Sequence, residues 1–318
     1  MWWNLPRDFG HTDENITFPV RMGIMLAAKE SICFDMYYNR DKEPYYDHII
    51  EGAPFNCREF HHSYNDGVWG QGFKDLDFLK KIKKLDLTVS LLDGFQTEFP
   101  RLDLLVIYGS NAQNNWYPDY EARNFWDLDG KMQILNKCEE LWQSGYRCAL
   151  VPDYTITDGR TKIEGNKISF NGHTFTHLLF LYPKYAKSDV YEFLNNADES
   201  GVPMAVVGRC DIDFDANNAE LSAPHWDEYS ISVPESIGCP KSAIDGGCIY
   251  TDGSFCMVSG GILTGEMKEF SFKIGDTVYS GRHTGLMAYR KVKFAFASVG
   301  SELFENGIKV DLEYKEAR

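Results

Sequence analysis

The segment at residues 57–72, CREFHHSYNDGVWGQG, gathers side chains that bind metals or carry protons. These side chains belong to Cys57, Glu59, His61, His62 and Asp66. Such residues serve three kinds of chemistry: a metal centre, an acid/base pair, or the polar wall of a binding pocket. Adjacent residues point apart on a strand and diverge on a helix, so His61 and His62 chelate less well than histidines four residues apart on a helix. The spacing argues against a metal site, and we expect neither a metal nor a cofactor.

Two interpretations of this segment remain open. As a pocket wall, it would hydrogen-bond to a substrate or stack on it through Arg58, Glu59, His61, His62 and Trp69. As a polar loop, it would satisfy its own backbone groups and have no ligand.

A second group of polar and aromatic residues lies in ICFDMYYNR, residues 32–40. The apolar and aromatic run predicts a buried strand, with Asp35 inside it and Arg40 just after it. Alternation along a strand turns one of Tyr37 and Tyr38 inward, and the sequence leaves open which one. A buried Asp35 would need a partner, which is either another side chain or a substrate.

The elements that position these residues can be read from the spacing of apolar residues. The periodicity predicts helices at 18–30 and 74–94, with a strand at 32–38 and a long loop at 39–73 between them. The second helix has a predicted apolar face of Leu76, Leu79, Ile82 and Leu85. A loop of this length inside a compact domain is typical of a functional segment.

The middle of the chain alternates apolar strands with helices, which predicts a parallel sheet with right-handed crossovers. The expected strands cover 103–109, 147–153, 177–183 and 203–209, and the expected helices cover 129–146 and 188–201. A polar hairpin follows the second strand, with turn signals at Asp158-Gly159, Gly165-Asn166 and Asn171-Gly172. From about residue 222, short strands separated by glycine-containing turns predict a small all-β domain.

Composition excludes several functions. The formal charge is −15 with no offsetting basic stripe, so neither nucleic acid nor an anionic membrane is an expected partner. The 8 cysteines include no CxxC pair, which argues against structural zinc. The chain shows no signal peptide and no apolar run of membrane-span length, so we expect a soluble, cytoplasmic protein. The 7 Trp, 18 Tyr and 21 Phe suit carbohydrate-binding surfaces and large cores alike.

The order of these parts resembles the C-terminal half of barrel glycoside hydrolases of the thermophilic-type β-galactosidase kind. The segments ICFDMYYNR and KDLDFLKKIKKLDLTVSLLDG correspond to the last barrel strand and helix, and RLDLLVIYGSNAQNNWYP to the start of a glutamine-amidotransferase-like domain. CIYTDGSFCMVSGG corresponds to a terminal β domain. The resemblance implies an α/β chain with a partial (β/α) barrel segment at 1–98, a flavodoxin or class I amidotransferase-like parallel α/β domain at 99–220, and a small all-β domain at 221–318.

The resemblance implies that the chain is the C-terminal portion of a glycoside hydrolase, an enzyme that hydrolyses glycosidic bonds. Glycoside hydrolases use two carboxylates that flank the glycosidic bond. The family places them after the fourth and seventh barrel strands, and the chain starts at MWWNLPRDFG, which maps beyond the seventh, so no catalytic residue has a counterpart here. The chain would supply a pocket wall, with Tyr37 or Tyr38 lining a sugar subsite. The amidotransferase-like domain would serve as a scaffold for a homo-oligomer.

The amidotransferase chemistry itself is not expected. Cys210 follows a predicted strand, but Arg209 and Asp211 beside it are too large for the sharp turn of a nucleophile elbow. The acidic run at 211–217 lacks the glycine and the terminal glutamate of a calcium loop. Two alternatives remain: a stand-alone, non-catalytic binding or assembly protein built on this domain, and a complete enzyme with an acid/base pair drawn from Asp35, Glu51 and Glu59.

Overall fold

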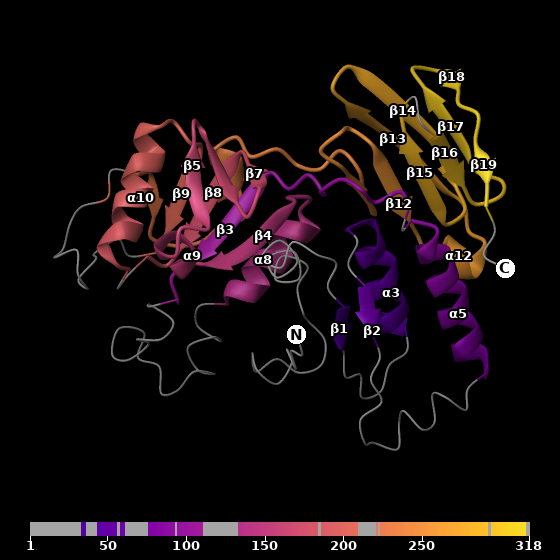
Figure 1. Cartoon of the computed structure of the whole chain (residues 1–318), viewed down its shortest axis with the longest axis horizontal. Helices are drawn as coiled ribbons and strands as arrows, with labels where there is room; N and C mark the ends of the chain where they lie inside the picture. Colours follow the sequence, from indigo (N-terminus) through magenta and orange to yellow (C-terminus); the bar gives the residue numbers. More distant parts are fainter. Residues whose placement is uncertain are drawn as a thin grey trace. The chain divides into compact units, whose positions relative to one another are not determined.

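The computed structural model describes most of the chain from residue 33 onwards (Figure 1). The described residues are 33–35, 43–55, 58–60, 76–92, 94–110, 133–183, 186–208, 221, 223–291 and 294–315. They fall into two compact units. We call the first the discontinuous unit, because it combines residues of Ser31–Arg101 with those of Ala243–Arg318. The second, the sheet unit, contains Leu102–Ser242.

The sheet unit is built on five parallel strands. They are β3 (Leu104–Tyr108), β4 (Cys148–Pro152), β8 (His177–Leu181), β9 (Met204–Val207) and β10 (His225–Trp226). Their order across the sheet is β10-β9-β8-β3-β4, which is the order of flavodoxin-like folds. Most residues of the first four strands are buried, as in a sheet covered on both faces. The predicted α/β class and its four main strands are confirmed.

Helices and a small antiparallel sheet complete this unit. Helices α8 (Ile134–Gln143) and α10 (Ser188–Glu199) confirm two predictions. The predicted hairpin region holds a short helix, α9 (Tyr154–Thr157), and then β5 (Thr161–Glu164), β6 (Lys167–Phe170) and β7 (His173–Phe175). Asn171 and Gly172 both have positive φ, 49° and 88°, as a tight hairpin turn of this kind requires. A short helix, α11 (Ser232–Ser236), follows β10.

The first part of the discontinuous unit corrects the predicted loop at 39–73. It contains β1 (Cys33–Asp35), α3 (Glu43–Gly52), the 3-10 turn η1 (Ala53–Phe55) and β2 (Arg58–Phe60). Strands β1 and β2 pair in parallel. The helix buries Tyr46, Ile49 and Ile50, which lie three and four residues apart on one face. That spacing was present in the sequence but was obscured by Gly52 and Pro54.

Helix α5 (Leu76–Ser90) confirms the second predicted helix, although its buried face is shifted. Leu85 is buried as expected, but Leu76 is 69% exposed. The remaining buried residues of this face lie toward the end of the helix and just beyond it, at Val89 and Leu92. The helix predicted at 18–30 lies outside the described residues.

The second part of the discontinuous unit consists mainly of two sheets, as predicted for a small β domain. The five-stranded sheet has the order β11 (Gly247–Ile249), β12 (Phe255–Val258), β15 (Leu286–Arg290), β16 (Phe294–Ala297) and β19 (Glu313–Tyr314). The four-stranded sheet has the order β13 (Lys268–Ile274), β14 (Thr277–His283), β17 (Glu302–Glu305) and β18 (Ile308–Lys309). A short helix, α12 (Gly261–Thr264), follows β12.

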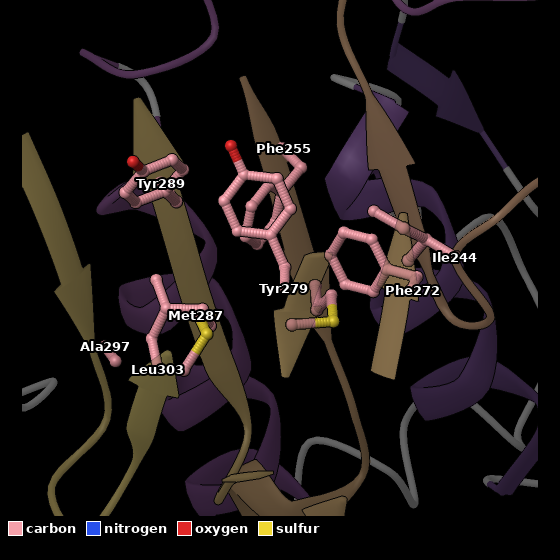
Figure 2. Close-up of a cluster of buried hydrophobic side chains, with 9 residues drawn as sticks. Ile244, Phe255, Phe272, Tyr279, Met287, Tyr289, Ala297 and Leu303 are labelled. Atoms are coloured by element: carbon pink, nitrogen blue, oxygen red, sulfur yellow. The ribbon is translucent and has the colours of Figure 1, made fainter. Parts of the chain in front are cut away.

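An aromatic core joins these two sheets (Figure 2). Phe255 of the five-stranded sheet lies edge-on to Phe272 and Tyr279 of the four-stranded sheet, with ring centroids 5.0 and 5.1 Å away. Met287, Tyr289 and Leu303 close the cluster. Side chains from both sheets therefore fill one interior, as in a β-sandwich.

Hydrogen bonds explain why both chain segments belong to one unit. The Tyr250 hydroxyl donates to the Pro54 carbonyl, and Gln96 Nε2 donates to the Tyr250 hydroxyl at 3.1 Å. Arg290 Nη2 donates to the Phe95 carbonyl, and Pro100 forms an isolated antiparallel β-bridge with Tyr250.

The domain boundaries expected at residues 98 and 220 remain a prediction. Among the described residues, no helix has the length and apolar character needed to cross a membrane.

Candidate functional site

Two of the residues singled out in the sequence lie on neighbouring strands. Asp35 is the last residue of β1, and Glu59 is the middle residue of β2. In the parallel register Asp35 pairs with Phe60 and Phe34 pairs with Glu59. The two acidic positions are thus one register step apart on adjacent strands, which are positions on alternate faces of the two-stranded sheet. This juxtaposition could not be read from residues 24 positions apart in the sequence.

The other members of these two groups are not placed. Tyr37, Tyr38, Arg40, His61, His62 and Trp69 lie outside the described residues. Their substrate-binding roles stay predictions, and so does the exclusion of a metal at the histidine pair. Glu51, named above for an acid/base pair, is an exposed residue of α3.

Five cysteines have buried side chains: Cys138, Cys148, Cys239, Cys248 and Cys256. Burial raises the pKa of Cys239 to about 12 and holds the pKa values of Cys138 and Cys148 well above the usual range. A thiol must ionise to act as a nucleophile or a metal ligand, so these three are inert at neutral pH. Within the described ranges, no group of three His, Cys, Asp or Glu side chains could hold a metal ion. Cys210 lies outside those ranges.

A second candidate site lies at the carboxyl edge of the parallel sheet. In open α/β sheets, ligands bind outside the carboxyl ends of strands, especially where the strand order reverses. Here β3 is followed by Ser110 and β4 by Asp153. The Ser110 hydroxyl donates a hydrogen bond to Asp153 Oδ1. The Asp153 N–H donates to the Tyr108 carbonyl at 2.9 Å, which fixes the two strand ends side by side.

This edge combines a buried polar layer with an exposed ring. Asp153 is 1% exposed, whereas the next residue, Tyr154, is 54% exposed. Burial, and then the neighbouring Tyr154 and Asp153, raise the pKa of Tyr108 far above its usual value, so its phenol stays protonated. The Arg160 guanidinium lies 5.8 Å from the Tyr154 ring centre. Arg160 also binds Asp158 through its side chain.

A residue with an uncommon backbone conformation lies near the point where the strand order reverses, between β3 and β8. Tyr182 directly follows β8 and has φ of 59°, which is uncommon for a residue other than glycine. A Cβ at Gly208, after β9, would lie 2.7 Å from the Tyr182 ring, so the ring needs glycine there. The Lys137 ammonium lies 5.4 Å from the Tyr182 ring centre and 5.6 Å from that of Tyr229. Burial lowers the pKa of Lys137.

The sequence analysis did not predict this second site, because it looked for functional residues at the carboxyl end of the first predicted strand and not at the ends of the later strands. The signal was nevertheless present. A polar residue directly follows one predicted parallel strand, at Ser110, and another polar residue ends the next one, at Asp153. The strain at Tyr182 had no sequence signal, because it depends on how close the end of β9 comes to the end of β8.

The fold is therefore of the mixed α/β class, with a five-stranded parallel sheet followed by antiparallel and mixed β-sheets. No family model and no curated protein match the chain. The chain shows a distant structural similarity to a rhamnosidase from Novosphingobium sp. PP1Y, with a TM-score of 0.38 and 11% sequence identity. The match covers 90% of this chain and 30% of the rhamnosidase chain.

Proposed function

We propose that this chain is part of a carbohydrate-active protein of the glycoside hydrolase type, in which β1 and β2 supply one wall of a sugar-binding site. One observation carries the proposal: β1 and β2 are parallel neighbours with α3 between them in the chain, so their carboxyl ends, where Asp35 pairs with Phe60, lie at one edge of the sheet. Strand–helix units of barrel enzymes carry their functional residues at the carboxyl ends of parallel strands.

The role assigned to Asp35 and Glu59 is to accept hydrogen bonds from sugar hydroxyls. Ionised carboxylates accept two or more such bonds, and charged acceptors bind more strongly than neutral ones. His61 and His62 follow β2 directly in the sequence and are assigned to the same wall. The proposed substrate class is a β-galactoside, on the resemblance described above. The two catalytic carboxylates are not assigned to this chain.

Saturation-transfer NMR with methyl β-D-galactopyranoside tests this proposal. The wild-type chain is expected to bind the glycoside, and the Glu59→Gln and Asp35→Asn variants should each weaken binding by about 1.5–3 kcal/mol, the usual contribution of a hydrogen bond to a charged group. Glu51→Gln is a matched control, because Glu51 is exposed on α3. Binding that is absent in the wild type, or unchanged in both variants, would refute the proposed wall. A p-nitrophenyl β-galactoside assay should show no turnover, and turnover would instead support the complete-enzyme alternative.

The sheet unit supports a second candidate, a scaffold without catalysis of its own. The observation in its favour is that Cys138, Cys148 and Cys239 are buried, so these three cannot provide an amidotransferase nucleophile, and Cys210 is disfavoured by the large residues beside it. We propose that this unit supports assembly into a homo-oligomer. Light scattering coupled to gel filtration tests the assembly: a monomer across the micromolar range would exclude it.

A further inference from the structure

Tyr154 differs from the other described aromatic residues of the sheet unit because the residue is 54% exposed at a fixed position. It is the first residue of α9, directly after β4, and Thr155 and Ile156 beside it are buried. Backbone hydrogen bonds from Ile156 N–H to Asp153 O and from Asp158 N–H to Tyr154 O hold this turn at 2.9 and 3.0 Å. The ring is therefore presented to solvent from a rigid base.

An ion pair with fork geometry lies beside the ring. Arg160 Nε lies 3.0 and 2.9 Å from the two Asp158 carboxylate oxygens, and Nη2 lies 2.6 Å from Oδ2. The Arg160 N–H adds a fourth bond to the same carboxylate at 3.1 Å. The side chains of Arg160 and Asp158 remain 35% and 40% exposed. Donors and acceptors are thus fixed in direction and still open to a ligand.

The guanidinium is also held by aromatic rings. Its central carbon lies 5.8 Å from the Tyr154 ring centre and 6.0 Å from that of Phe170 on β6. Because Arg's planar group is preorganised by these contacts, a ligand that bonds to it loses little side-chain entropy. The Arg160 hydrogen bonds lower the pKa of Asp158, so the carboxylate stays ionised and accepts hydrogen bonds at neutral pH.

This combination fits a neutral sugar better than other ligands. A pyranose ring packs its apolar C–H face on an aromatic ring and offers neighbouring hydroxyls as both donors and acceptors. Asp158 neutralises Arg160, so the pair gives no net attraction to phosphate. A nucleic-acid strand is disfavoured further by the formal charge of −15.

We infer that Tyr154, Asp158 and Arg160 form a carbohydrate-binding subsite at the carboxyl edge of the parallel sheet, separate from the wall assigned to β1 and β2. Tyr154 supplies the stacking platform. The Asp158 carboxylate accepts hydrogen bonds from sugar hydroxyls, and the outward N–H groups of Arg160 donate to them. The inference shares its ligand class with the proposed function and rests on it to that extent.

The test is saturation-transfer NMR with three probes: the methyl glycosides of β-D-galactose, β-D-glucose and α-L-rhamnose. Tyr154→Ala should weaken binding of at least one probe by tenfold or more, while Tyr154→Phe, which keeps the ring, should retain it. Arg160→Lys keeps the charge and loses the fork, so it should weaken binding of the same probe. Tyr314→Ala is the control for removal of an exposed tyrosine, since Tyr314 is 51% exposed in the discontinuous unit.

The outcomes separate this subsite from the proposed wall. A probe that responds to Tyr154→Ala and not to Glu59→Gln supports the subsite and counts against the wall. A probe that responds only to Glu59→Gln overturns the subsite and leaves the wall standing. No binding of any probe to the wild-type chain overturns both. Far-UV circular dichroism of each variant confirms that the fold is intact.

Discussion

Acid is predicted to destabilise the discontinuous unit through one histidine. His283, the last residue of β14, is 2% exposed, and its ring centroid lies 6.1 Å from that of Phe270. Its Nδ1 atom has no hydrogen-bond partner among the described residues. Burial, and then the nearby Lys268, lower the pKa of His283 from 6.5 to about 4. The folded state therefore favours the neutral ring.

The sign and size of the effect follow from the two pKa values. Above pH 6.5 the ring is neutral in both the folded and the unfolded chain, so no stability is lost. As the pH falls from 6.5 toward 4, His283 becomes protonated in the unfolded chain but stays neutral in the folded chain. The free energy of unfolding therefore decreases over that window. At pH 5 the loss is about 2 kcal/mol, and below pH 4 it approaches about 3.4 kcal/mol, at 1.36 kcal/mol for each pKa unit.

Urea unfolding at pH 7.5 and pH 5, on the wild type and on His283→Gln, measures this loss. Between the two pH values the wild type should lose about 2 kcal/mol more than the variant, which cannot take up the proton. Carboxylates such as Glu302 and Glu305, whose pKa values are lowered by hydrogen bonds, contribute equally to both proteins and cancel. His225→Gln removes an exposed histidine as a control. Equal losses in wild type and His283→Gln would refute the reasoning.

Two further substitutions probe packing. Phe255→Ala removes a fully buried ring that contacts Phe272 and Tyr279, and should cost about 3–5 kcal/mol in the free energy of unfolding, measured by urea titration; a loss below about 1 kcal/mol would contradict the sandwich core. Gly208→Ala places a methyl group 2.7 Å from the Tyr182 ring at a φ of 100°, and should cost about 1–3 kcal/mol. Combining it with Tyr182→Ala should restore part of that loss, and strict additivity would show that the ring is not the cause.

The parallel sheet was predictable because strands buried on both faces leave continuous apolar runs, as in LLVIY of β3. The two-residue strand β10 gave no such signal, since its pairing is decided by the neighbouring β9. Helix α3 was overlooked although its apolar residues have helical spacing, because glycine and proline nearby indicated a loop. Sequence patterns carry local periodicity well. They indicate which segments pair as strands of one sheet only where the strands are buried along their whole length.

The candidate sites divide in the same way. That Asp35 and Glu59 would matter was suggested by residue type, but their adjacency depends on a register set by tertiary packing. The Asp158–Arg160 pair is local, only two residues apart, and could have been proposed from sequence. The position of this pair beside Tyr154 could not have been proposed, because it depends on helix α9 following strand β4 directly.

The discontinuous unit has a consequence for the order of assembly during synthesis. The chain leaves this unit after Arg101 and re-enters it at Ala243. Within the unit, Pro100 and Tyr250, one from each chain segment, form a β-bridge. Its four- and five-stranded sheets are translated after the sheet unit, so residues up to Arg101 lack these partners while the strands of the sheet unit can already pair with one another. Closing a long flexible loop costs entropy that grows with its length. A sheet unit that folds first replaces that loop by a compact body, and so lowers the cost of bringing the two halves together.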